Sequence, residues 1–447
     1  MTGFVFLAAF LGLPLVGAAP FLSRRWSGLP LGGAVASAAA VGAVILCAQM
    51  FVLTVIGVRA TPWLLLAAPA VAIAVVAARG GTLAGRLSTR ARWTDCATPA
   101  TWGLLVLTAA ALAAVTYAAM TARVTSSDLH LFWAAKGERF GLEGRIDVAF
   151  LGRPDHRLMH ADYPPLWPCL YAFATMLAGR FAWGAALATL PFFLALSVVA
   201  AASFARPRLG CLEAAGLAAV FAALFGFLLS HGMTAGNADP ALLFFETLAL
   251  CLLVFAREEP GAFLVAGIAL SGAAWLKLEG IAFGWAVIAA AALAIRPFSG
   301  RKLAQLAVPP LIAYGTWMAF CRAHGLLDTL GSHRFLVSAE RLRTVASGML
   351  RAASMGSAYL PWILVALLFV LRRPGGAAVF AVLVAAFIAA FDCTFYLSSQ
   401  GDPAVWILMA GERTLMTPLL ALLLAAMAPA GATVSAEPRS AGASSRP

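Results

Sequence analysis

The chain of 447 residues is strongly apolar and carries a net charge of +12. Hydrophobic residues make up 62% of the chain and charged residues only 11%, whereas soluble domains carry about a quarter charged residues. This composition excludes a soluble globular domain. A basic chain can bind nucleic acid, but here the Arg residues lie in short segments between apolar runs, where they set membrane orientation. We therefore expect no nucleic-acid partner.

Apolar runs long enough to cross a bilayer recur along the chain. A hydrocarbon core about 30 Å thick requires about 20 apolar residues per helix, and the runs lack the period-two alternation of a membrane barrel. We therefore expect an all-α polytopic membrane protein with about 13 transmembrane helices. The predicted spans are 3–21, 30–57, 62–78, 101–121, 181–204, 212–231, 239–256, 261–276, 280–296, 303–321, 350–371, 376–396 and 413–429.

Basic residues in the short connections predict how these spans are oriented. Arg and Lys are concentrated in every second connection, and the positive-inside rule places those connections in the cytoplasm. The remaining connections then face outward, and all six His residues lie in or next to them. Polar residues collect in loops because loops are solvated, but a one-sided concentration of titratable groups also indicates a site at the outer surface.

The chain divides into three predicted regions. Residues 1–98 contain three spans and form an accessory N-terminal transmembrane module. Residues 99–429 form the main transmembrane domain, which contains a long outer loop at 122–180. Residues 430–447 are rich in Ala, Ser, Pro and Gly, and we expect them to form a disordered cytoplasmic tail.

The long outer loop begins with the charged stretch SSDLHLFWAAKGERF at 126–140. As a helix, residues 129–142 would place aromatic side chains on one side and Lys136 and Arg139 on another, which suits a helix lying in the membrane interface. Asp128 precedes this helix. It would either cap the helix, which contributes roughly 1 kcal/mol, or point into a cavity as a catalytic base.

The outer loop ends with HADYPPLWP at 160–168, where prolines predict a rigid extended entry to the apolar segment 166–179. A crossing by this segment would place Arg206 and Arg208 outside. We therefore expect 166–179 to rest on, or dip into, the outer leaflet.

Three further polar insertions are predicted to face the same side: GNADP at 236–240, LKLEG at 276–280 and GER at 411–413. Asp239 lies where a helix N-terminus favours an anion. Simpler alternatives are a surface ion pair between Lys277 and Glu279, and an Arg413 side chain that only reaches toward the interface. Within the apolar spans, Glu246 and Asp392 require partners, for a structural or a functional reason.

The order of these motifs resembles polytopic glycosyltransferases of the GT-C superfamily, in the bacterial branch related to protein mannosyltransferases and aminoarabinose lipid A transferases (glycosyltransferase family 39-like). Such proteins share a D-x-x-x-x-W-x-x-K-A-like stretch, Y-P-P-L, G-x-A-D and T-K-x-E-G in this order. The matches are Asp128 with Trp133 and Lys136, residues 163–166, residues 236–239, and residues 277–280. The resemblance covers about residues 100 to 429.

The resemblance implies an inverting transfer of a sugar from a polyprenyl-phosphate donor to a lipid, glycan or protein acceptor. The enzyme would lie in the bacterial cytoplasmic membrane with its active site facing the periplasm or exterior. Asp128 would act as general base. The candidates for binding the donor phosphate are Lys136, Arg139, Lys277, His333, Arg334 and Arg413. The candidates for binding or orienting sugar and acceptor are His160, Asp162, Tyr163, Asn237, Asp239, Glu279 and Glu412.

Two departures from the family pattern limit what is carried over. The module at 1–98 is additional, and the loop carries Asp128 beside Ser127 where many relatives have an acidic pair. No metal ligands are assigned, no cofactor is assigned with certainty, and a divalent cation stays open. The alternative function is a transporter or flippase, which would place its ionisable residues near the midplane, or a polymerase of lipid-linked glycans.

Overall fold

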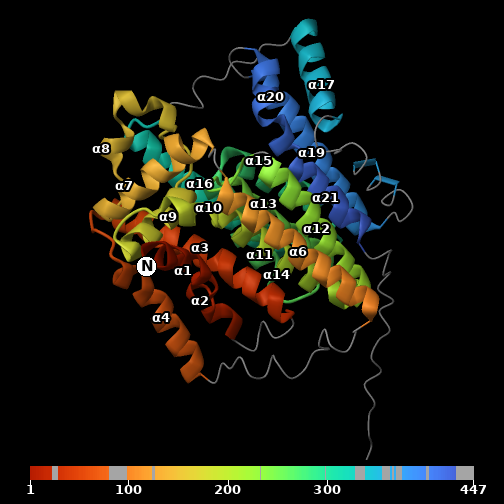
Figure 1. The fold of residues 1–447 in the computed structure, drawn as a ribbon, viewed down its shortest axis with the longest axis horizontal. Helices are drawn as coiled ribbons and strands as arrows, with labels where there is room; N and C mark the ends of the chain where they lie inside the picture. The colour runs from red at the N-terminus through yellow and green to blue at the C-terminus, as the bar shows by residue number, and fades with distance from the viewer. Residues whose placement is uncertain are drawn as a thin grey trace, which may run out of the picture.

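The computed structural model describes residues 1–22, 29–79, 98–122, 126–231, 233–296, 298–327, 338–354, 363–364, 367–368, 375–398 and 402–428. Their secondary structure is entirely helical, as expected (Figure 1). Seven helical segments in this part of the chain are long and apolar enough to cross a bilayer, which identifies an integral membrane protein. These segments are Leu31–Val55 (α3), Pro99–Thr121 (α6), Trp183–Leu209 (α10 and α11), Cys211–His231 (α12), Gly300–Ala323 (α16), Gly376–Ser398 (α19) and Pro403–Ala426 (α20 and α21).

Other predicted spans correspond to shorter helices, so the total of about 13 crossings stays a prediction. These helices are α1 (Thr2–Leu11), α4 (Pro62–Ala78), α13 (Asp239–Phe255), α14 (Ala262–Leu276) and α15 (Leu278–Ala294). The first predicted span is interrupted, because Gly12 separates α1 from α2 (Leu13–Val16), which has Pro14 in its first turn and is followed by η1 (Ala19–Leu22). Most of the predicted span 350–371, beyond α17 (Ala339–Ser354), lies outside the described residues, as does the tail 430–447.

The predicted start of the last span at residue 413 is wrong. A helix already begins at Pro403, where the Asp402 side chain accepts a hydrogen bond from the Ala404 N–H. This helix, α20 (Pro403–Thr414), is separated by Leu415 from α21 (Met416–Ala426). Arg413 therefore lies in the last turn of a helix next to a break, rather than at the head of a span.

The segment after Pro164 and Pro165 forms a short helix, α9 (Leu166–Ala178), that is buried in the protein. Its residues 166–175 are all buried in the protein. It packs on α1, α3 and α7 (Ala135–Glu143). We expected this segment to contact the outer leaflet, but the N-terminal helices cover it. Residues 1–22 and 29–55 thus contribute to the same core as the rest of the described chain.

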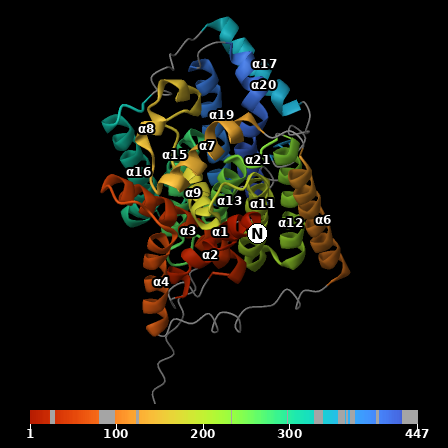
Figure 2. The same cartoon turned by 60° about the vertical axis from the view of Figure 1, so that its left-hand side comes forward.

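The central helices pack closely around α13 and α14. Helix α11 (Thr189–Leu209) lies against α12 and α13, α14 lies against α16, and α19 lies against α15 and α21. Helix α6 runs beside α12, and α17 beside α20, in both views of the molecule (Figure 2). Every residue of α13 is buried, so this helix forms the centre of the bundle.

The turn that contains Arg208 and the turn that contains Asp239 lie at opposite ends of α13. At its C-terminal end, Arg208 donates a hydrogen bond to the carbonyl oxygen of Phe255. Asp239 occupies its N-terminal end, and 17 residues of helix span about 25 Å. The predicted segregation of the Arg208 and Asp239 turns to opposite ends is therefore present in the fold.

Gly280 allows α14 and α15 to approach closely at their connection. A Cβ atom at this position would collide with the carbonyl oxygen of Ala273 in α14. Backbone atoms cannot move aside cheaply, so even alanine would push the two helices apart.

We expect Gly280→Ala to destabilise the protein by about 1–3 kcal/mol, the usual cost of overpacking a core. Gly284→Ala is the matched control on the same helix, because a Cβ there meets no atom within 4 Å. The comparison is made by thermal unfolding in one detergent. Equal melting temperatures for the two variants would show that the helices are not in contact at Gly280.

Candidate functional site

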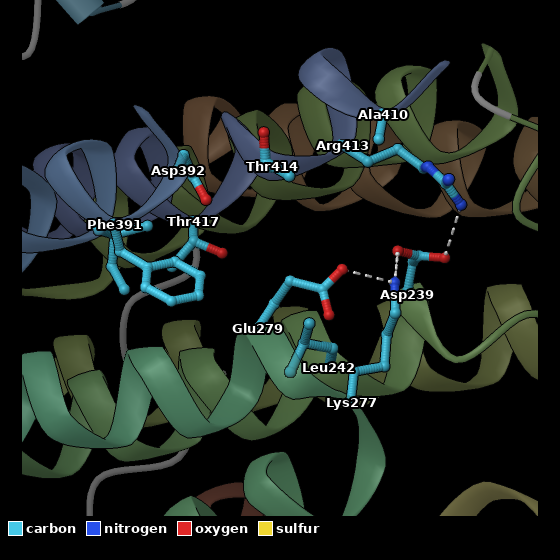
Figure 3. Close-up of a pocket in the computed structure, with 11 residues that line it drawn as sticks. Asp239, Leu242, Lys277, Glu279, Phe391, Asp392, Ala410, Arg413, Thr414 and Thr417 are labelled. Carbon is cyan, nitrogen blue, oxygen red and sulfur yellow. Dashed lines mark hydrogen bonds and ion pairs between the residues drawn. The ribbon is translucent and has the colours of Figure 1, made fainter. Parts of the chain in front are cut away.

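Five charged side chains from distant parts of the sequence form an alternating ion-pair chain: Asp128, Arg413, Asp239, Lys277 and Glu279. Arg413 Nη1 donates to Asp128 Oδ2 at 3.1 Å and to Asp239 Oδ2 at 3.4 Å. Lys277 Nζ lies 3.0 Å from Asp239 Oδ1 and 3.3 Å from Glu279 Oε1 (Figure 3). The motifs recognised in the sequence therefore converge on one site.

Hydrogen bonds of the GNADP turn hold Asp128 near the other members of the chain. Asn237 Nδ2 donates to Ser126 Oγ, which also accepts a hydrogen bond from the Asp128 backbone N–H. The carbonyl oxygen of Gly236 accepts hydrogen bonds from Trp167 and Tyr171 of α9. Buried α9 thus fixes the turn that positions Asp128.

Gly236 itself meets a steric requirement of this turn. Its φ angle of +82° is one that L side chains rarely adopt, and a Cβ would press on Leu129. Leu129 begins the π-helical segment η4 (Leu129–Ala134), which continues into α7. Asp128 precedes η4 but makes no side-chain capping hydrogen bond. Its carboxylate is directed to Arg413 instead, so capping does not account for this residue.

Lys277 and Asp239 are buried and depend on each other. Their side chains are only 9% and 6% exposed. Burial opposes the charge on Lys277, but the Asp239 and Glu279 carboxylates outweigh burial and raise the pKa of Lys277 above its ordinary value. The pair is therefore more than the surface ion pair considered from the sequence, because only Glu279, at 37%, is substantially exposed.

A small cavity of about 30 Å³ lies beside the ion-pair chain. Asp239, Lys277, Glu279 and Arg413 form part of its wall, as Figure 3 shows. Helices α13, α19, α20 and α21 supply the remaining lining residues, which are Leu242, Ile388, Phe391, Asp392, Ala410, Thr414 and Thr417. The cavity thus joins the charged groups to polar side chains deeper in the helix bundle.

Tyr163 of the DYPPL motif lies close enough to the ion-pair chain to sense its charges. Burial and the negative charge of Glu279 raise the pKa of the Tyr163 phenol above its ordinary value, so the phenol keeps its proton. Its ring packs edge-on against Trp133, with ring centres 5.9 Å apart. This motif therefore adds a neutral hydroxyl near the charged groups.

An apolar groove of about 560 Å³ runs between α15, α16 and α19. It is lined by Leu278, Ile281, Ala282, Trp285, Ala286, Ala289, Tyr314, Phe387, Phe391, Thr394, Phe395 and Ser398. Phe391 also lines the small cavity, and Leu278 lies between Lys277 and Glu279 in the sequence. The groove therefore begins where the charged groups end.

Several residues predicted for phosphate or sugar binding lie elsewhere. Lys136 was expected on the polar side of an interfacial helix, but it is only 2% exposed and donates to the His160 carbonyl oxygen at 2.7 Å. Asp162 is buried near Lys136, and its carbonyl oxygen accepts a hydrogen bond from Trp317. Because α7 packs on α9, its Lys136 side faces the protein interior rather than water.

Arg139 also lies apart from the ion-pair chain. It pairs with Asp147 at 2.7 Å and with Glu143 at 3.2 Å on the surface of the outer loop. Glu412 is half-buried beside Arg413 in α20 and does not line the small cavity. His333 and Arg334 lie outside the described residues.

Sequence reasoning missed some polar residues in the wall of the cavity. Asp392 was noted as an acid inside an apolar span, a signal that could have assigned it to the site. Thr417 gives no such signal, because a single Thr is common in membrane helices. Ser126 was overlooked as the link between the Asp128 loop and the GNADP turn.

Comparisons of the chain with protein-family models, with curated proteins and with solved structures found no match.

The burial of Lys136 leads to a test of its structural role. Burial lowers the pKa of Lys136 to about 7, although the nearby Asp162 opposes this shift. The unfolded chain, whose lysines keep an ordinary pKa, then binds more protons than the folded chain above pH 7. This group consequently makes the fold more stable as pH rises from 7 to 9, by about 2 kcal/mol.

We expect the thermal midpoint of the wild type to rise between pH 7 and pH 9 relative to that of Lys136→Met, which lacks the titrating group. Differential scanning fluorimetry of both proteins in one buffer series measures this difference. Arg139→Met is the control, because its guanidinium keeps its charge across this range. Parallel pH profiles for wild type and Lys136→Met would contradict the buried placement of Lys136.

Proposed function

We propose that the protein is a membrane glycosyltransferase that moves a sugar from a polyprenyl-phosphate donor to an acceptor at the outer membrane surface, with inversion at the anomeric carbon. The observation that carries the proposal is the convergence of Asp128, Asp239, Lys277, Glu279 and Arg413 beside an apolar groove. A lipid-linked sugar presents the same sequence of chemistry: a long apolar tail, a phosphate and a polar ring.

The cations of the ion-pair chain suit a departing phosphate. Arg413 uses only Nη1 for both of its carboxylate partners, and the described residues provide no acceptor for its Nε and Nη2 groups. A guanidinium presents five N–H donors in a planar fork, so two phosphate oxygens can bind without breaking the existing pairs. Lys277 lines the same cavity and adds a second positive charge.

The apolar groove suits the carrier tail. Its walls belong to α15, α16 and α19, and several of its side chains, including Trp285 and Phe387, are exposed on the surface of the protein. A tail lying there would remain in contact with lipid while its phosphate reaches Lys277. Phe391 lines both the groove and the small cavity.

Asp128 is the proposed general base. Its side chain is 27% exposed, whereas that of Asp239 is only 6% exposed, so an acceptor hydroxyl can approach Asp128. Arg413 holds the carboxylate at 3.1 Å. In the proposed step, Asp128 takes the acceptor proton as the acceptor oxygen bonds to the anomeric carbon, and the carbon–phosphate oxygen bond breaks with its electron pair going to the phosphate.

One observation favours the transporter alternative. Glu246 and Asp392 lie within helices α13 and α19 and are buried, and acids at membrane depth often mark transport pathways. Both functions require a lipid-linked ligand, but only the transferase requires a base at Asp128.

Asp128→Asn is therefore expected to reduce sugar transfer at least about 100-fold, the lower end of the contribution of a general base. The assay measures transfer of the radiolabelled sugar from its polyprenyl-phosphate carrier by the purified protein reconstituted into liposomes. Asp155→Asn is the control, because Asp155 is an exposed acid of the same outer loop whose ion-pair partners among the described residues are its neighbours Arg153 and His156. Unchanged transfer by the Asp128 variant would exclude the proposed base.

The proposed orientation makes a second prediction. With the wild type as background, Asp155→Cys is expected to react with a membrane-impermeant maleimide in intact spheroplasts. Glu258→Cys, an exposed position at the opposite end of α13, is expected to react only after the membrane is permeabilised. The reverse pattern would place the ion-pair chain on the cytoplasmic side and remove the basis for an extracytoplasmic transferase.

A further inference from the structure

The wall of the small cavity contains hydrogen-bond acceptors that have no donor among the described residues. Asp392 Oδ2 and Glu279 Oε2 are both buried from solvent, and the described residues provide neither with a hydrogen-bond partner. Asp392 as a whole is only 4% exposed, and it points toward the cavity from α19 (Figure 3). Buried carboxylate oxygens are nearly always hydrogen-bonded in folded proteins, so two unpartnered oxygens beside one cavity require an explanation.

Thr417 adds a third acceptor to the same wall. Its hydroxyl donates to Glu246 Oε2 at 2.8 Å, and both groups are buried. Because a hydroxyl has one proton, the Thr417 oxygen can only accept hydrogen bonds from anything else in the cavity. Glu246 thus fixes the direction of the Thr417 hydroxyl without lining the cavity itself.

The cavity wall carries both donors and acceptors. Lys277 and Arg413 supply donors, whereas Asp392, Glu279 and Thr417 supply acceptor oxygens, and Glu279 uses only its other oxygen to pair with Lys277. Its volume of about 30 Å³ accommodates roughly two water-sized groups. The described residues also contain no group of three His, Cys, Asp or Glu side chains arranged to hold a metal ion. A ligand that donates hydrogen bonds through one or two small groups matches these properties.

We infer that Asp392, Glu279 and Thr417 form a hydroxyl-binding subsite that accepts hydrogen bonds from neighbouring hydroxyl groups of the transferred sugar. This inference rests on the proposed function, because it takes the donor phosphate to lie at Lys277 and Arg413. One or two hydroxyl groups of the sugar then enter the cavity toward Asp392 while the ring itself stays outside, and the enzyme selects sugars that carry donor groups at these positions. The apolar residues Leu242, Ile388 and Phe391 exclude water from these hydrogen bonds.

The test is a binding measurement with the full chain in lipid nanodiscs. The probes are farnesyl phosphate and its mannosyl, glucosyl and arabinosyl derivatives. The derivative that the wild type binds most tightly is then compared with its deoxy analogues, in which single hydroxyls are replaced by hydrogen. Asp392→Leu is expected to weaken binding of this sugar carrier at least about tenfold, while binding of farnesyl phosphate stays unchanged.

A double-mutant cycle identifies the hydroxyl concerned. One deoxy analogue should bind the wild type more weakly than the parent carrier does. The same analogue should bind Asp392→Leu and the wild type equally well, because it lacks the hydroxyl that contacts Asp392. Thr417→Val should also weaken the parent carrier selectively. Ser271→Ala is the control, since Ser271 is a buried hydroxyl in α14 whose hydrogen bond goes to the Gly267 carbonyl oxygen.

Unfolding temperatures measured without ligand distinguish a change in folding from a change in binding. Without ligand, Asp392→Leu and the nearly isosteric Asp392→Asn should unfold at the same temperature as the wild type or higher, because each removes an unpartnered buried carboxylate. If Asp392→Leu binds the sugar carrier as well as the wild type does, the inference is overturned and the proposed function stands. If the wild type binds none of the farnesyl probes, the proposed function fails and the subsite inference falls with it.

Discussion

The site depends on charge compensation between Lys277 and its carboxylate partners at the end of the helix bundle. A lysine with a side chain only 9% exposed is stable there because Asp239 and Glu279 both lie within 3.3 Å. Removal of one partner from such a buried pair typically costs about 3–5 kcal/mol, since the other charge is left without compensation. The ion pairs thus link α13, α15 and α20, and they bring the Asp128 loop to the same point through Arg413.

The helical membrane architecture could be predicted from the sequence because it depends on local patterns. The five members of the ion-pair chain were among the candidates that the order of the motifs gave, but that order did not separate them from Lys136 and Arg139, which lie elsewhere. Apolar runs require helices in lipid, and charged residues at the ends of such runs are costly unless they meet. Lys136 could not be placed in the same way. Its neighbours Lys136-Gly-Glu-Arg indicate a solvated helix face, but tertiary packing of α7 against α9 buries it. The burial of α9 itself depends on N-terminal helices more than 100 residues away, which no local pattern indicates.

The small cavity and the apolar groove are neighbours of different polarity. Phe391 belongs to both, with carboxylates on one side and aromatic and aliphatic side chains on the other. An amphiphilic molecule bound across both would meet an environment matched to each of its parts in turn. The glycine at position 280 contributes indirectly, since the close approach of α14 and α15 sets the position of the lysine between them.

The break at Leu415 separates two helices with different surroundings. Helix α21 is buried throughout, whereas α20 presents Leu408, which is 86% exposed, and packs mainly against α17. Arg413 belongs to the outer helix and Thr417 to the inner one. Leu415 between them keeps helical backbone angles, and hydrogen bonds from its N–H to Gly411 and from the Leu419 N–H to its carbonyl oxygen connect the two helices. This connection fixes the spacing between the guanidinium of Arg413 and the hydroxyl of Thr417, so the two groups are presented to the cavity as one unit.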